Sequence, residues 1–173
     1  INITDEGTIT DLNVEVNLSS SIPYALEWMS IQLLSPYGNT VELAHGNNFA
    51  ASGSFDGGNL YNTIFDDDAT ASIFDGTSPF AGTFQPEGSL LDFNGQSING
   101  EWKLLINNYQ GTTGTVDFTI FASTNDSEPE IIPDYGTPYS SEESNFIGDN
   151  LTIIPINITD EGTITDLNVE VNL

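Results

Sequence analysis

Cysteine is absent from this 173-residue chain, and lysine and arginine together occur once, as Lys103. Without cysteine there is no disulfide and no thiol chemistry. The sequence shows no signal peptide, and no apolar run approaches the roughly 20 residues needed to cross a bilayer. No stretch keeps a helical period, whereas Gly, Pro, Thr, Asn and aromatic residues are frequent. These features predict an all-β protein with many turns and no membrane insertion.

The near absence of basic residues leaves 26 Asp and Glu unbalanced, for a formal net charge of −25. Such a surface repels phosphate backbones and anionic lipids, which disfavours binding to nucleic acids and lipid surfaces and favours cations or basic surfaces as partners. Divalent ions or salt would relieve the self-repulsion. Two settings fit: a secreted protein in a calcium-rich medium, or a cytosolic protein of a salt-loving organism. Because the acids cluster in turn-like segments, we expect the first, an extracellular or cell-surface location.

One segment occurs twice: residues 1–18 and residues 156–173 both read INITDEGTITDLNVEVNL, displaced by 155 positions. A repeat of this length without a difference indicates one period of a tandem array followed by the start of the next period. An engineered duplication or a circular permutation would give the same pattern. The array predicts neighbouring copies of the same repeat as partners, in the same chain or in another chain.

The repeated segment has the pattern of a strand. Its apolar residues from Leu12 to Leu18 alternate with polar ones, which predicts one buried and one solvated face. Ile1, Ile3 and Ile9 have the opposite parity. The sequence therefore predicts a bulge or short turn at Thr10 and Asp11.

Two further patterns predict hairpins. Residues 29–33 and 41–43 alternate on either side of the turn sequence Ser-Pro-Tyr-Gly-Asn at 35–39. Residues 102–106 and 116–120 alternate around a glycine-containing turn at 111–114. Residues 46–63, rich in Gly, Asn and Ser, are interpreted as a long surface loop.

Three consecutive aspartates, Asp66, Asp67 and Asp68, form the densest acidic cluster. Calcium takes about 6 to 8 oxygen ligands, supplied by carboxylates and carbonyls on turns. The sequence therefore predicts a calcium site, without the spacing of an EF-hand. Its candidate ligands are these three aspartates together with the nearby Asn59, Asn62, Asp56 and Asp75. The alternative is a solvated acidic turn.

Nucleophilic catalysis is not indicated. A Ser-His-Asp triad would have to use His45, the only histidine, and no nucleophile motif surrounds any serine. We interpret His45 as a surface turn residue, and Trp28 and Trp102 as packing residues. The chain is therefore expected not to be an enzyme.

The segments fall into three parts. Residues 1–123 are predicted to form one β-sandwich, because the strand patterns end there. Residues 124–148 are acidic and contain several prolines, which is typical of an extended linker. Residues 149–173 restart a strand pattern with LTIIP at 151–155 and continue into the second copy, so they are interpreted as the first strands of the next repeat, available to another unit.

Five segments in order resemble the P domain, the β-sandwich module that follows the catalytic domain of subtilisin-like proprotein convertases. They are ITDLNVEVNL, MSIQLLSPYGNTVELAHG, NLYNTIFDDDA, PFAGTFQPEGSLLDFNG and NGEWKLLINNYQGTTGTVDFTIFAS, and they cover residues 1 to about 123. The family pattern begins one strand earlier, and the corresponding text, LTIIP, stands only before the second copy. The resemblance implies a jelly-roll or Greek-key-like sandwich that often carries calcium and has no catalytic residues of its own.

Together these features predict a non-catalytic, calcium-stabilised structural or adhesive repeat of a large secreted or cell-surface protein. Strand sharing between units would build a stalk or filament, because an unpaired strand is a template for another body. The first alternative is the ancillary domain of a secreted subtilisin-like protease. A weaker one is a carbohydrate-binding module that holds a surface glycan on exposed aromatic residues.

Overall fold

The computed structural model describes the backbone of residues 1–46, 57–125, 137–140, 144–146 and 151–155, and the side chains up to residue 125. It is an all-β, sandwich-like fold, as the sequence predicts, and its only helical elements in these ranges are short 3-10 turns. Within the same ranges no helix is long and apolar enough to cross a membrane.

The first sheet has the strand order β10-β9-β2-β5-β6, and β11 also pairs with β9. All its pairings are antiparallel except β5 with β6. Its strands are β2 (Thr8–Ser20), β5 (Asn59–Phe65), β6 (Gly82–Phe84), β9 (Gly114–Asn125), β10 (Thr137–Ser140) and β11 (Ser144–Phe146).

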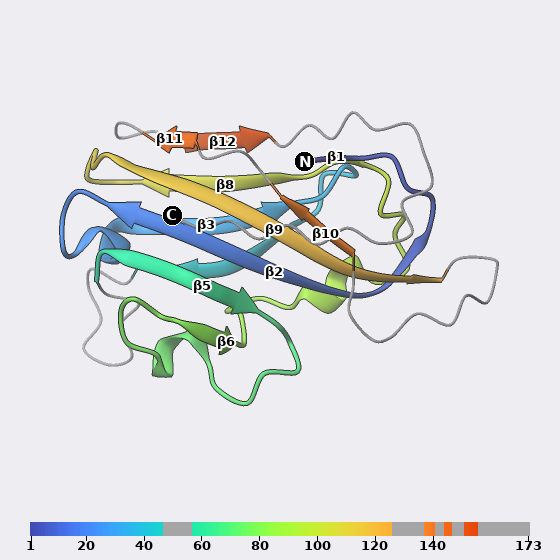
Figure 1. Cartoon of the computed structure of the whole chain (residues 1–173), viewed down its shortest axis with the longest axis horizontal. Coiled ribbons are helices and arrows are strands. Elements are labelled where there is room, and N and C mark those ends of the chain that lie inside the picture. The colour runs from blue at the N-terminus through green and yellow to red at the C-terminus, as the bar shows by residue number, and fades with distance from the viewer. Residues whose placement is uncertain (47–56, 126–136, 141–143, 147–150, 156–173) are drawn as a thin grey trace.

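The second sheet has the order β12-β8-β3-β4, all antiparallel. Its strands are β3 (Met29–Leu34), β4 (Thr40–His45), β8 (Lys103–Asn108) and β12 (Leu151–Pro155). Two further short strands, β1 (Asn2–Ile3) and β7 (Gly100–Glu101), pair with each other. Figure 1 shows β9, β2 and β5 lying over β8 and β3, with the core between the two sheets.

The alternation read from the sequence gives the core. Leu12, Val14, Val16 and Leu18 of β2 are at most 2 % exposed. The predicted change of phase is confirmed, because the β2–β9 register shifts between Ile9 and Asp11. Residues on both sides of that bulge therefore reach the same core.

The 3-10 turn η3 (Leu90–Phe93) closes one end of the core. Phe93 is fully buried and meets Trp102 edge to face, with ring centroids 5.1 Å apart. The indole of Trp102 also donates to the Ile98 carbonyl oxygen at 2.9 Å, so its polar atom is satisfied inside the core. Trp28 is half-buried in η1 (Ala25–Trp28), so both tryptophans pack as predicted.

One hairpin is confirmed and the other prediction is wrong. β3 pairs with β4 through the turn at 35–39, where the amide of Ser35 donates to the Asn39 carbonyl oxygen. β8 does not pair with β9: β8 lies between β3 and β12, whereas β9 lies between β2 and β10. Both strands do bury the predicted side chains, but they face each other across the core and belong to different sheets.

Two other segments differ from the sequence interpretation. Asn59 and Asn62 belong to β5 and not to a surface loop, because the strand begins at Asn59. Residues 47–56 of that predicted loop lie outside the described residues. In the range 124–148, interpreted as a linker, β10 and β11 pair with β9 and extend the first sheet.

Candidate functional site

The three consecutive aspartates form a turn directly after β5. The amide of Asp68 donates to Asp66 Oδ1 at 2.8 Å, and the amide of Ala69 donates to the Asp66 carbonyl oxygen at 3.1 Å. Asp66 thus closes its own turn, as aspartate commonly does by bonding backbone two residues on. The turn keeps Asp68 exposed and Asp67 partly covered.

Asp67 is bound to the start of η3. Its Oδ2 accepts from Ser89 Oγ and from the amide of Leu91, both at 2.8 Å, and its Oδ1 accepts from the amide of Leu90 at 3.1 Å. Backbone amides at the start of a helical turn have no partner within the turn, so this carboxylate satisfies them from a distant segment. Both carboxylate oxygens of Asp67 therefore stabilise the start of η3.

Asp11, which the sequence interpretation did not include, joins the acidic turn from the bulge of β2. Partial burial raises the pKa of its carboxyl group, and the negative charges of Asp66 and Asp68 raise that pKa further. The antiparallel pairing of β2 with β5 brings these residues together across more than fifty positions of sequence. No local sequence pattern identifies Asp11 as a neighbour of this turn, since the sequence of one strand does not specify which strand it pairs with.

The other predicted calcium ligands are dispersed. Asn59 begins β5, and seven residues of extended chain place it roughly 23 Å from Asp66. Its Oδ1 accepts from the amide of Ser20 at 3.0 Å, whereas the amide of Asn62 donates to Asn17 Oδ1 at 2.7 Å.

Two predicted ligands remain. Asp75 is in η2 (Ile73–Asp75), and Asp56 lies outside the described residues. In the described ranges no three His, Asp or Glu side chains are grouped as metal ligands, so the described members of the predicted set do not form one preformed site.

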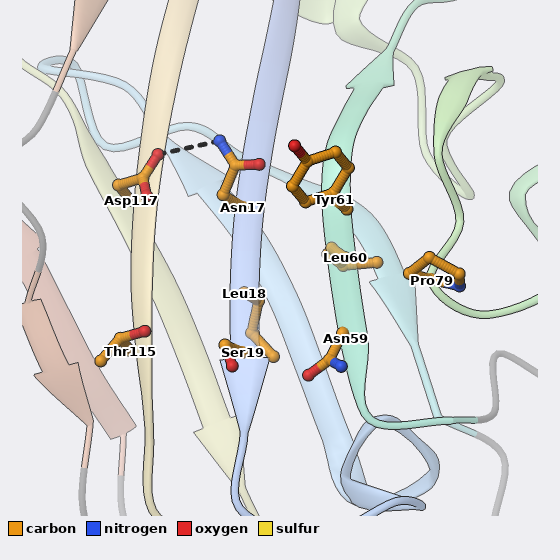
Figure 2. Close-up of a pocket in the computed structure, with 9 residues that line it drawn as sticks. All are labelled: Asn17, Leu18, Ser19, Asn59, Leu60, Tyr61, Pro79, Thr115 and Asp117. Carbon is orange, nitrogen blue, oxygen red and sulfur yellow. Dashed lines mark hydrogen bonds between the residues drawn. The ribbon is translucent and has the colours of Figure 1, made fainter. Parts of the chain in front are cut away.

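A groove of about 280 Å³ lies on the outer face of the first sheet, across β9, β2 and β5 (Figure 2). Asn17 Nδ2 donates to Asp117 Oδ1 at 3.0 Å on one side, and Tyr61, which is 57 % exposed, stands on the other. The floor includes Leu18 and Ser19, next to the register shift between Val16 and Leu18. The groove offers amide and hydroxyl groups beside one aromatic ring.

His45 is the last residue of β4 and pairs through Nδ1 with Glu87, while its ring meets Phe74 edge to face. Ser30, its cross-strand neighbour, donates its hydroxyl to Glu42 Oε1 at 2.8 Å. A second hollow, of about 420 Å³, lies on the second sheet and is lined by His45, Glu87, Ser30 and Glu42 among others. The serine proton is thus directed to a carboxylate and not to the imidazole.

The edge of β8 is the site most directly connected with the repeat. β12 pairs along it antiparallel, with Pro155 opposite Lys103, and β1 pairs with β7 with Asn2 opposite Glu101. Trp102 lies between these pairs and exchanges two backbone hydrogen bonds with Ile1, of 2.8 and 2.7 Å. β12 and β1 therefore form one line along residues 100–108, and Figure 1 shows the N-terminus beside the end of β12.

The pairing register of β12 and β1 agrees with the displacement of 155 positions between the two copies of the repeated segment. Beyond Lys103, the next position along this edge is that opposite Trp102, which Ile1 occupies, and Ile1 is the sequence counterpart of the residue that follows Pro155. Displaced by the repeat distance of 155, β12 thus occupies the five positions directly before Ile1. Residues 151–155 and 1–3 behave as one strand, cut between Pro155 and Ile1.

Comparison with protein-family models, with curated proteins and with solved structures finds no match. Function is therefore inferred from the repeat, the register at β8 and the surface of the chain.

Proposed function

We propose that this chain holds one unit, and the start of the next, of a tandem array of β-sandwich modules. The array would serve as a non-catalytic structural or adhesive part of a large secreted or cell-surface protein. The single observation that carries the proposal is the shared register of β12 and β1 along β8 and β7. An identical segment recurs in sequence, and the strand before it fits the same sheet edge in phase.

The register also suggests where each unit begins. If residues 151–158 form one strand, the unit starts with LTIIPINI and spans 155 residues. This matches the opening strand that the resemblance to the P domain implies. A unit supplied with this strand covers the edge of β8, whereas a unit without it exposes that edge to pairing with another body. Strand sharing at β8 is accordingly the proposed link between units.

Calcium belongs to the proposal as a counter-ion of the acidic turn, where the charges of Asp66 and Asp68 act on Asp11, although these described residues form no preformed ligand cluster. Burial and mutual repulsion raise the pKa of Asp11, so a cation beside it would stabilise the folded state. A bound ion raises stability by mass action. The melting midpoint should therefore rise with millimolar calcium and fall with a chelator, and magnesium at the same ionic strength is the control. An unchanged midpoint would refute the calcium part of the proposal and would not affect the tandem array.

The array is tested by sequencing the parent reading frame and by pulling a protein of several joined units. Successive copies at a period of 155 residues, and force–extension peaks spaced by about 500 Å, are expected. A single copy behind a subtilisin-like protease domain would instead support the ancillary-domain alternative.

The groove of Figure 2 favours carbohydrate binding as the second candidate. A sugar ring stacks on an exposed aromatic ring, and its hydroxyls accept hydrogen bonds from amides and donate them to carboxylates; Tyr61, Asn17 and Asp117 present these groups together. A glycan array with the wild type and Tyr61→Ala tests it. Tyr24→Ala is the matched control, since Tyr24 is similarly exposed (64 %) and does not line the groove.

A further inference from the structure

The chain contains two chemically identical segments for one pair of strand positions. Residues 1–18 fill the positions of β1 and most of β2, where β2 is the central strand between β9 and β5. Residues 156–173 lie outside the described residues and have the same sequence. Only one of the two segments fits at a time, because both would pair with the same strands.

The backbone at β12 directs the second copy to these positions. Pro155 ends opposite Lys103, so the next residue of the same chain comes opposite Trp102, where Ile1 now bonds. Continuing the register places Asn157 opposite Glu101, as Asn2 is, and Ile158 opposite Gly100, as Ile3 is. No residue has to be inserted or skipped.

The core would be refilled without a change of shape. The buried side chains Leu12, Val14, Val16 and Leu18 have as counterparts Leu167, Val169, Val171 and Leu173. A substituted segment of identical sequence creates no cavity and no overpacking. The pairings to β9 and β5 would also be reproduced, since both depend on the same residues.

We propose that residues 156–173 are a second occupant of the β1 and β2 positions in their own chain, so that the protein folds in two frames. The first frame uses residues 1–155, as in the structure. The second uses residues 19–173, with residues 1–18 displaced. The inference goes beyond the proposed function, because it holds for this chain whether or not its parent contains further units.

Each frame has one break in the backbone. In the first frame it falls between Pro155 and Ile1, where the terminal amine is partly buried and its pKa is lowered to about 5, chiefly by desolvation. In the second it falls between Leu173 and Ser19, at the groove of Figure 2 that Leu18 and Ser19 line on the outer face. The frames thus share a core and differ at their chain ends.

Paired substitutions in the whole chain test this. Val16 is fully buried at the centre of β2, so Val16→Asp should abolish the first frame, and Val171→Asp should abolish the second. Each single variant is expected to keep the near-ultraviolet circular dichroism of Trp102 and a cooperative melt within a few degrees of wild type. The double variant should lose both. Ile120→Asp is the matched control, because this buried β9 residue has no second copy and should unfold the chain alone.

The amine of Ile1 gives an independent readout. In Val171→Asp it should titrate near 5, as a buried group, whereas in Val16→Asp it should titrate near 8, as a displaced one. Val16→Asp as unfolded as Ile120→Asp would overturn the inference, and so would a folded double variant. Light scattering decides the source of the strand: a folded Val16→Asp monomer supports exchange within the chain, and folding only as a dimer overturns it in favour of a second copy.

Discussion

Replacing Asp67 by alanine should destabilise the fold independently of any metal. The substitution removes three hydrogen bonds that hold η3, to Ser89 Oγ and to the amides of Leu90 and Leu91. Each is worth about 1 kcal/mol net in a partly solvated setting, so we expect a loss of about 2–3 kcal/mol. For a chain of this length that lowers the melting midpoint by roughly 4–12 °C.

The assay is thermal and urea unfolding of Asp67→Ala, Asp67→Asn and Asp68→Asn, each with calcium and with chelator. Asp67→Asn keeps one acceptor oxygen and should lose about half as much stability. Asp68→Asn in chelator is the control, because the substitution removes the same charge from an exposed neighbour that is not bonded to η3. Equal midpoints for Asp67→Ala and Asp68→Asn in chelator would refute the capping role. A loss that disappears in chelator would make Asp67 a calcium ligand instead.

Three other substitutions or conditions probe the core and the charges. Phe93→Ala should cost about 3–5 kcal/mol in urea unfolding, because a fully buried ring against Trp102 is removed; a cost under 1 kcal/mol would contradict that packing. Asp11→Asn should raise the free energy of unfolding at pH 7 by about 1 kcal/mol or less, since it removes a partly buried charge and its repulsion with Asp66. The gain should shrink on acidification, as the wild-type carboxyl group, whose pKa is raised in the folded state, takes up its proton; a gain that grows at low pH would be inconsistent. In Val171→Asp, stability should rise more steeply from pH 5 to 8 than in Val16→Asp, because the unfolded amine of Ile1, at 8.0, binds protons that the folded amine, near 5, does not; equal slopes would speak against its burial.

The alternation of residues was a sound guide to burial and a poor guide to partners. It placed Trp102, Leu104 and Val116 in the core, and all three are buried. It also joined residues 102–106 to 116–120 as a hairpin, whereas β8 and β9 lie in different sheets. Side chains facing each other across a sandwich produce the same period as side chains of one hairpin, so the period alone does not separate the two.

In the candidate sites, too, local features were predicted from the sequence and contacts between distant segments were not. The aspartate turn is visible in sequence because its residues are consecutive, but the capping bonds of Asp67 depend on η3, more than twenty positions later. Asp11 reaches the turn only through the pairing of β2 with β5. Asn59 and Asn62 are close in sequence to the aspartates, yet an extended strand carries neighbours apart at about 3.3 Å per residue.

The sequence by itself determined the duplicated eighteen-residue segment, its displacement of 155 positions, the all-β class, the bulge at Thr10–Asp11 and the acidic composition. Each of these depends on residue identity or on spacing along a single strand. Only the tertiary structure decided which strands pair, and in particular that β12 lies on β8 in phase with β1. Register between distant strands is fixed by the joint packing of two sheets, which no single segment specifies.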